Sequence, residues 1–536
     1  MMHSRNYLFS TAIAIVTASL PVAAQETQRS GPAVSSGYEH VLLISVDGMH
    51  AVDLANWIQH NPNSNFAKLA ATGIIYPNAF TTAPSDSYPG MIAQATGGSP
   101  KTAGLFYDDS YDRTVYPSKA SFTSQGMTDP GCTGSPGAEL TNFEELDKSY
   151  DFSTGLVADV TGGGTLGQVL TQLDPDNMQR RLVNGECTPI YPHQYIRTNT
   201  IFEVIKKAGG LTAWSDKHPA YEILSGPSGR GIDDLFAPEI NSQLPGAPAG
   251  QDYTTSYSGV QKYDTLKVNA VVNWIDGLNS TATANPGVPT IFGMNFQAVS
   301  VGQKLAKAGF GDDPSLKGGY LDSNATPGNA LQQQFEFVDN ALGEFKAELV
   351  KRGLDNSTLI IVSAKHGQSP IDPKDRVIQS DKPFQQVPGF GSHGFEICDD
   401  VGLIWLEPDL QKDNYDAARA YLQANAATLH ISELLDRTSL TPLYGDPFEN
   451  SRVPDLIAVT DHGVICTGGT KLAEHGGFSD DDRNVLLLLS SAQIKAQVVE
   501  ALSYTTQIAP TILAALGLDP RQLMSVQREG TSVLTR

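Results

Sequence analysis

A series of short, continuous apolar runs is the feature of this sequence that most constrains its fold. Patterns with helical spacing lie between several of these runs, for example over 200–210 and 329–351. A strand that is apolar without alternation is buried on both faces, which is typical of a parallel sheet covered by helices on both sides. The chain is therefore predicted to be an α/β protein with a doubly wound, mostly parallel sheet. The six runs are HVLLISVDG (40–48), PTIFGMNF (289–296), TLIIVSA (358–364), VGLIWL (401–406), PDLIAVT (454–460) and NVLLLLS (484–490).

One region differs in composition from the rest of the chain. Residues 116–198 are rich in Gly, Pro, Asp and Thr, and they have no apolar run of this kind. The full length of 536 residues suits one large α/β domain with insertions, or two to three domains. We expect one domain over 40–536, with a Gly/Pro-rich insertion or cap at about 116–198.

The chain has four cysteines, and three pairings of them are possible. No two of them have the Cys-x-x-Cys spacing of a zinc or redox site, so we interpret all four as structural. We favour Cys132 with Cys187 and Cys398 with Cys466, because each pair then lies within one region of the chain.

The N-terminal residues are typical of a secretory signal peptide. Arg5 provides the positive charge, an apolar stretch runs from Leu8 to Leu20, and small residues precede Gln25. We expect a signal peptide over 1–24, a linker over 25–39, and a secreted or periplasmic protein with no membrane segment after cleavage. An uncleaved anchor is the alternative.

The net charge of −22 argues against a nucleic-acid duplex as a partner, because phosphate binding needs a basic surface. The sequence leaves the oligomeric state open.

Two polar turns in the first part of the chain are candidates for chemistry. Asp47 ends the first apolar run, at a position where α/β proteins often place a metal ligand. In APSDSYPG (83–90), Ser85 and Ser87 precede a helical pattern, and the positive end of a helix stabilises an oxyanion. Taken alone, Asp47 could equally form a turn, and the serines could be helix caps.

Histidine followed by glycine occurs four times in the second half of the chain. His366 and His475 stand at the ends of expected strands, whereas His393 and His462 are weaker examples. A single His-Gly turn is often only a hydrogen-bonded loop, but four such turns favour a functional site.

Taken together, these features resemble the alkaline phosphatase superfamily, and within it the nucleotide pyrophosphatase/phosphodiesterase branch. The similarity rests on Asp47 after a strand, PSDSYPG, the later His-Gly turns and the C-terminal QIAPTILAALGL. It implies an alkaline phosphatase type of fold, with Asp47 as a metal ligand. The family motif Pro-x-x-Ser/Thr-aromatic-Pro falls on Pro84 to Pro89, so Ser87 rather than Ser85 is the expected nucleophile.

The sequence departs from this family at the metal ligands. Lys365 stands where the family has Asp, and Gln297 and Val301 stand at the positions of a second Asp and a His. Asp108 occupies the position of a phosphate-binding Asn. Asp47, His366 and His475 remain, so the resemblance implies at most one divalent metal, with zinc favoured, and makes a two-metal site doubtful.

We therefore expect an exported hydrolase of phosphodiester or phosphomonoester bonds that acts on a small phosphorylated substrate. Ser87 is the expected covalent nucleophile. Lys365 would take its proton or hold a phosphoryl oxygen, and His366 or His475 would protonate the leaving group. The residues expected to bind substrate are Asp108, Gln297, Lys217 and His218, the last two on the polar stretch 213–236, which could also be a surface loop.

Two other functions fit the same residues. The first is a catalytically silent protein that binds an anion or another ligand on the enzyme scaffold. The second is a single-metal enzyme similar to sulfatases, but those use a Cys/Ser-x-Pro-x-Arg turn, and Met91 stands where this turn needs Arg.

Overall fold

The computed structural model describes residues 37–140 and 174–535. The expected signal peptide, most of the expected linker, and part of the 116–198 insertion lie outside these residues. No helix within the described ranges is long and apolar enough to cross a bilayer.

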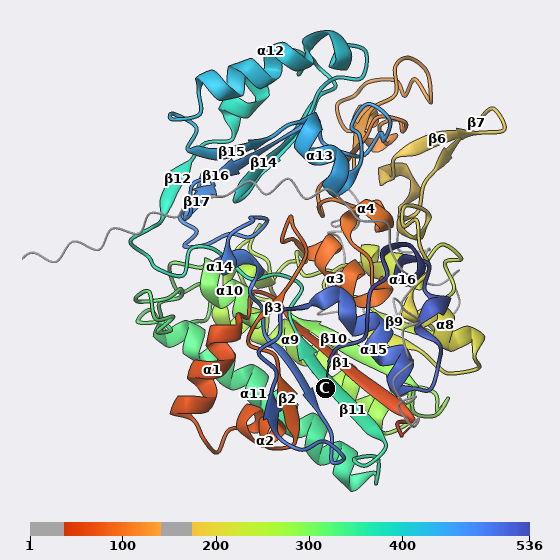
Figure 1. Cartoon of the computed structure of the whole chain (residues 1–536), viewed down its shortest axis with the longest axis vertical. Helices are drawn as coiled ribbons and strands as arrows, with labels where there is room; N and C mark the ends of the chain where they lie inside the picture. Colours follow the sequence, from red (N-terminus) through yellow and green to blue (C-terminus); the bar gives the residue numbers. More distant parts are fainter. Residues whose placement is uncertain (1–36, 141–173, 536) are drawn as a thin grey trace, which may run out of the picture.

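The core is an eight-stranded, mostly parallel sheet, as the sequence predicts (Figure 1). β1 lies at its centre, parallel to β10 on one side and to β11 on the other. On the far side of β11 the direction reverses, because β18 pairs antiparallel with β11 and β2 pairs antiparallel with β18. The strands, in spatial order, are β19 (Gln497–Val498), β2 (Gly73–Ile75), β18 (Leu487–Ser490), β11 (Thr358–Ser363), β1 (His40–Val46), β10 (Ile291–Phe296), β8 (Ala213–Ser215) and β9 (Asp234–Phe236).

Helices cover both faces of this sheet. Alternate residues of β1 enter two different cores: Val41 and Leu43 pack with α3, α8 and α15, whereas Leu42 and Ile44 pack with α1, α2, α9 and α11. Burial on both faces explains the continuous apolar runs of the central strands. These helices are α3 (Ser87–Thr96), α8 (Ile201–Lys207), α15 (Ile508–Ala515), α1 (Ala51–His60), α2 (Asn65–Ala71), α9 (Tyr257–Ile275) and α11 (Asn329–Lys351), and α10 (Ala298–Lys304) follows β10.

A separate antiparallel sheet corrects one prediction. The runs 401–406 and 454–460 do not join the parallel sheet but form β14 and β16 of a four-stranded antiparallel sheet, in the upper part of Figure 1. One face packs against α12 through Ile404 and Leu456, and the other covers Phe106 and Tyr107. An antiparallel strand with both faces covered has the same apolar pattern as a parallel one. The elements are β13 (Phe395–Cys398), β14 (Val401–Trp405), β16 (Leu456–Thr460), β15 (Ile431–Leu435), α12 (Gln411–Ala424) and α13 (Arg437–Tyr444).

Short elements complete the described fold. They are β3 (Ala79–Phe80), β4 (Tyr111–Asp112), β5 (Ala138–Glu139), β6 (Arg180–Val183), β7 (Glu186–Pro189), β12 (Val377–Gln379), β17 (Val464–Cys466), β20 (Ser503–Tyr504), α4 (Pro100–Ala103), α5 (Ala120–Thr123), α14 (Asp480–Arg483) and α16 (Met524–Glu529).

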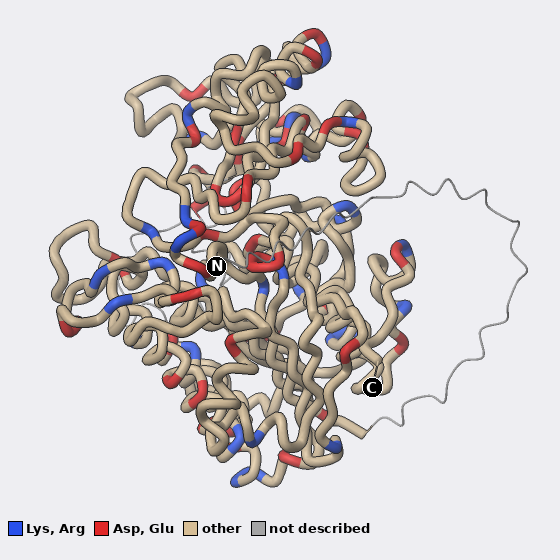
Figure 2. The backbone as a smooth tube through the Cα atoms, turned by 60° about the vertical axis from the view of Figure 1, so that its left-hand side comes forward, with Lys and Arg blue, Asp and Glu red and all other residues tan. Residues whose placement is uncertain are grey.

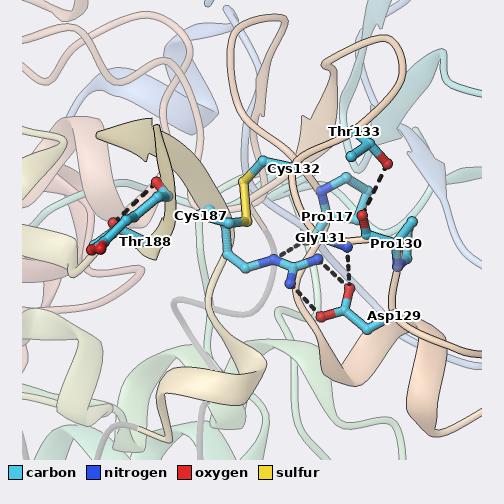
Figure 3. Close-up of a disulfide and its surroundings, with 10 residues drawn as sticks. Pro117, Asp129, Pro130, Gly131, Cys132, Thr133, Cys187 and Thr188 are labelled. Carbon is cyan, nitrogen blue, oxygen red and sulfur yellow. Dashed lines mark hydrogen bonds and ion pairs between the residues drawn. A yellow bond between two sulfur atoms is a disulfide. The ribbon is translucent and has the colours of Figure 1, made fainter. Parts of the chain in front are cut away.

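Both predicted disulfides are confirmed. Cys132 and Cys187 have Cα atoms 5.3 Å apart, and the Cα atoms of Cys398 and Cys466 are 5.5 Å apart. Figure 3 shows Asp129 in the surroundings of the first disulfide. Its carboxylate accepts two hydrogen bonds, of 2.7 and 2.8 Å, from the guanidinium of Arg180. The disulfide and the ion pair together hold the described ends of the 116–198 region, whose role as a cap stays a prediction.

Candidate active site

Three polar side chains meet where the three central strands end. Asp47 follows β1, Gln297 follows β10 and Lys365 follows β11, all at the carboxyl edge of the sheet. Gln297 Nε2 donates a hydrogen bond of 2.5 Å to Asp47 Oδ2, and Lys365 Nζ lies 3.3 Å from the same oxygen. Neighbouring parallel strands that end at one edge bring these residues together, as the sequence predicts.

Ser87 lies beside this group as the first residue of α3. Its Oγ accepts a hydrogen bond of 3.1 Å from Lys217 Nζ and lies 3.3 Å from His366 Nε2. The side chain is completely buried. An ammonium, an imidazole nitrogen and the positive end of a helix therefore surround one hydroxyl, and all three favour its alkoxide form.

The close approach of α3 to β11 depends on a glycine. A Cβ at Gly90 would lie 2.1 Å from the carbonyl oxygen of Lys365, so any side chain at this position would force the helix away. Gly90 thus allows the helix that carries Ser87 to pack directly on the strand end that carries Lys365 and His366.

Ser85 and Ser87 have different surroundings, although they stand two residues apart. Ser85 Oγ donates a hydrogen bond of 2.5 Å to the carbonyl oxygen of Asp482, away from the cluster around Ser87. Ser85 thus has a structural partner, and Ser87 is the serine that faces the titratable groups.

Lys365 is held by two carboxylates and a tyrosine. Its Nζ lies 3.3 Å from Asp47 and 3.4 Å from Asp216, and it donates a hydrogen bond of 2.9 Å to the Oη of Tyr221. The structure places Lys217, not Lys365, in hydrogen-bond contact with Ser87. The ammonium of Lys365 therefore balances the buried charge of Asp47, while that of Lys217 faces the hydroxyl.

Asp47 is held in its ionised form. Burial raises the pKa of its carboxyl, but Lys365 and His366 outweigh burial and hold that pKa well below its usual range. The result is a fixed negative charge next to a fixed positive charge at the base of the site.

His366 is oriented to accept a proton. Its Nδ1–H donates to the carbonyl of Gly367 at 2.8 Å, which leaves the lone pair of Nε2 on the side of Ser87. Burial lowers the pKa of His366 below its ordinary value although Asp47 opposes the shift, so the ring is neutral at neutral pH.

His475 lies against His366, with ring centroids 4.1 Å apart. Burial and the charges of Lys304, His366 and Lys217 lower the pKa of His475 well below its usual value. Its Nδ1 is 3.5 Å from Asp86, the residue that precedes Ser87.

The four residues expected to bind substrate line one cavity of about 480 Å³. Gln297 and Lys217 lie next to the reactive cluster, and the Nδ1 of His218 is 2.8 Å from the Oε1 of Glu239. The backbone N–H of Asp108 donates to Asp86 at 2.5 Å. Asp47, His366 and His475 line the same cavity.

Sequence reasoning missed two residues of this site. Asp216 lies directly before Lys217 in a stretch that is predicted to line a pocket, and its proximity to the predicted residue is the signal that could have identified it. Asp482 gave no comparable signal, because it belongs to an acidic run, SDDDR, that is typical of a solvated helix start.

Asp482 connects the three turns that carry the reactive side chains. Its carbonyl oxygen accepts hydrogen bonds from the Gly367 N–H at 2.6 Å and from Ser85 Oγ at 2.5 Å. Its carboxylate accepts from the Gly477 N–H at 3.1 Å. The turns of Ser87, His366 and His475 therefore share one anchor.

The residues at Asp47 do not fit a zinc ion. The Oδ2 atom is already in contact with the Lys365 ammonium and the Gln297 amide, and a dication would repel the ammonium. The other carboxylate oxygen of Asp47, Oδ1, has no hydrogen-bond partner among the described residues. Within 37–140 and 174–535, no three His, Cys, Asp or Glu side chains converge as a zinc site requires.

The fold is that of the alkaline phosphatase superfamily. The solved structure of the alkaline phosphatase PafA superposes with a TM-score of 0.56 at 14% sequence identity, covering 92% of this chain and 97% of that one. Murine ectonucleotide pyrophosphatase/phosphodiesterase 5 gives a TM-score of 0.51 at 15% identity, covering 90% and 96%. No curated protein matches the sequence.

The family model for type I phosphodiesterase/nucleotide pyrophosphatase matches residues 41–134 and 188–481. The chain belongs to this family and is a phosphoric ester hydrolase of the alkaline phosphatase superfamily. The gap in the match, 135–187, falls inside the predicted insertion.

Proposed function

We propose that this protein is an exported hydrolase of small phosphodiesters or phosphomonoesters in which Ser87 is the covalent nucleophile and lysines supply the positive charge of absent metals. The observation that carries the proposal is the position of Ser87 Oγ, 3.1 Å from Lys217 Nζ and 3.3 Å from His366 Nε2, at the start of a helix. A structure of the murine relative named above, as an inactive variant, is in complex with AMP, which supports a nucleotide-like substrate.

The first chemical step follows from these contacts. His366 Nε2 takes the proton of Ser87 Oγ, and the Oγ forms a bond to phosphorus as the bond to the leaving oxygen breaks. Lys217 stabilises the charge on the alkoxide and on the phosphoryl oxygens. The leaving oxygen takes up this proton from His366, which returns the imidazole to its neutral form.

The second step restores the enzyme. A water molecule attacks the phosphoryl group on Ser87 and gives one proton to the neutral imidazole of His366. The bond between phosphorus and Ser87 Oγ breaks, which releases phosphate or a phosphomonoester. The proton then returns to Ser87 Oγ. Lys365 does not react in this scheme, because its role is to balance the charge of Asp47 and to hold Asp47 and Asp216 in place.

The test is hydrolysis of bis-p-nitrophenyl phosphate and p-nitrophenyl phosphate by the mature protein, with zinc content measured on the same sample. Ser87→Ala should lower kcat by at least about 10³-fold. The matched variant Ser85→Ala removes the neighbouring hydroxyl and should cost far less, because that hydroxyl bonds only to a backbone carbonyl.

Mass spectrometry of the acid-quenched wild-type reaction should find the phosphoryl group on the peptide that contains Ser87. Full turnover by Ser87→Ala would contradict the nucleophile. Turnover proportional to bound zinc would contradict the metal-free charge arrangement. Absence of turnover with any added metal would support a silent anion-binding protein instead.

A further inference from the structure

A second cavity, of about 300 Å³, lies between the antiparallel sheet and the turns of the candidate active site. Carboxylates and hydroxyls dominate its lining, and no described lysine or arginine contributes to it. The buried oxygen-bearing side chains that line it are Asp400, Asp482, Ser369 and Thr460, and the half-buried Ser479 lines it as well. Figure 2 shows where Lys, Arg, Asp and Glu lie along the described backbone.

Asp400 has no partner for its charge. The residue is 4% exposed, and both of its carboxylate oxygens are buried without a hydrogen-bond donor among the described residues. It lies at the turn between β13 and β14, and its side chain is in contact with that of Asp482.

Asp482 approaches from the other side of the cavity and is 2% exposed. Its two carboxylate oxygens accept hydrogen bonds from the Gly477 N–H at 3.1 Å and from Ser479 Oγ at 2.6 Å. Two buried carboxylates in contact repel each other unless a proton or a cation lies between them.

We propose that this cavity binds one divalent cation of the Ca²⁺ class through the carboxylates of Asp400 and Asp482. The hydroxyls of Ser369 and Ser479 and water molecules would complete an all-oxygen shell, which is what hard cations prefer. His462 also lines the cavity, but its Nε2 is 3.0 Å from Asp481 and its Nδ1 is 3.5 Å from Asp375. The donors left at this place are oxygens, which suit a hard cation better than zinc.

The cation would connect the antiparallel sheet to the catalytic turns. Asp400 belongs to that sheet, whereas Asp482 anchors the turns of Ser87, His366 and His475. Bound cation is therefore expected to stabilise the relative position of these parts, even though it does not touch the reacting atoms. The inference does not depend on Ser87 being the nucleophile.

The experiment is a calorimetric titration of the full chain, stripped with a chelator, with CaCl₂, together with Tm measurements and KCl of equal ionic strength as the control for screening. With only two carboxylate ligands, we expect one site with a Kd of roughly 10⁻⁴–10⁻³ M. Saturation should raise Tm by about 1–2 °C, because the cation binds only the folded state and a chain of this length unfolds with a large entropy change.

Asp400→Asn should weaken Ca²⁺ binding at least tenfold, whereas Asp416→Asn should leave it unchanged. Asp416 is a suitable control because its side chain is 91% exposed on α12, which covers the same sheet. Ser369→Ala, a milder change, should weaken binding if Asp400→Asn fails to fold. Absence of saturable binding to the wild type, or wild-type binding by Asp400→Asn, would overturn the proposal, and the carboxylates would then share a proton.

Discussion

Asp47 and Asp400 are two buried carboxylates whose surroundings differ in one respect. Asp47 lies 3.3 Å from the Lys365 ammonium and accepts a hydrogen bond from Gln297. Asp400 has another carboxyl, Asp482, as its neighbour and no hydrogen-bond donor in the described part of the chain. The pKa shifts follow this difference. Burial raises both, but Lys365 reverses the shift at Asp47, whereas Asp482 increases it further at Asp400.

Burial alone therefore does not decide the protonation state of a carboxyl group. At Asp47 the charge is permanent, and its partner is built into the strand end where the family has a metal ligand. At Asp400 the charge depends on what the solution supplies, either a proton or a cation. The first arrangement suits a fixed electrostatic role in the site, and the second suits a ligand-dependent link.

The largest effect is expected when the paired charge loses its partner. Lys365→Met should lower the free energy of unfolding by about 3–5 kcal/mol, because Asp47 and Asp216 would lose the ammonium that contacts both of them. Urea unfolding measures the change, and phosphodiester hydrolysis should fall with it. Lys262→Met, an exposed change on α9, is the control. An unaltered unfolding midpoint would show that Lys365 does not neutralise these carboxylates.

A double variant tests the direct interaction between Asp47 and Lys365. Asp47→Asn combined with Lys365→Met removes both charges, so it should recover part of the stability that Lys365→Met loses. Its activity should not recover, because the electrostatic arrangement at the strand ends is still absent. Additive losses of stability in the double variant would contradict a direct interaction between the two side chains.

Neutralising Asp400 should change the free energy of unfolding in the opposite direction. In a chelator, Asp400→Asn should keep or raise stability, by up to about 1 kcal/mol near neutral pH, because the amide removes like-charge repulsion with Asp482. The single change Asp47→Asn should instead destabilise the protein by about 2 kcal/mol, since it removes a charged hydrogen-bond acceptor.

The pH dependence distinguishes the two carboxyls as well. The raised pKa of Asp400 means that its contribution to stability is present below the unfolded-state pKa and is lost as pH rises through the folded-state pKa. Urea unfolding in chelator, from acidic to neutral pH, should show this loss in the wild type and not in Asp400→Asn. A wild-type profile identical to that of the variant would contradict the assignment.

The sequence predicts much of this site for a simple physical reason. Asp47, Gln297 and Lys365 each follow a buried run, and the ends of adjacent parallel strands must converge. It does not predict which lysine contacts Ser87, because the direction of each side chain depends on Asp216, a residue that only the tertiary structure brings to Lys365. The sequence also does not distinguish the strands of the antiparallel sheet from those of the central sheet, because both are equally apolar.

The contact between Asp400 and Asp482 lies further beyond sequence reasoning. Asp400 lies in a turn of the antiparallel sheet and Asp482 lies in α14, and each stands in an acidic stretch that is typical of an exposed surface. Only the packing of the antiparallel sheet on the catalytic turns buries them together. Local patterns report the partners of a residue poorly when those partners come from another part of the fold.

A third carboxyl, Glu396, is intermediate between Asp47 and Asp400. Its partner is the neutral amide of Gln385, which donates a hydrogen bond of 2.9 Å, and burial raises its pKa to about 7. Its protonated form is thus favoured in the folded state, so its contribution to stability is present below about pH 4.5 and is lost as pH rises through about 7. The loss should be on the order of 2 kcal/mol.

Glu396→Gln should flatten this part of the profile in urea unfolding between mildly acidic and mildly alkaline pH, and an unchanged slope would mean that Glu396 titrates as an ordinary exposed carboxyl. Because no catalytic group contacts Glu396 in the described structure, its replacement should leave phosphodiester hydrolysis unchanged, which separates the stability of the antiparallel sheet from the chemistry at Ser87.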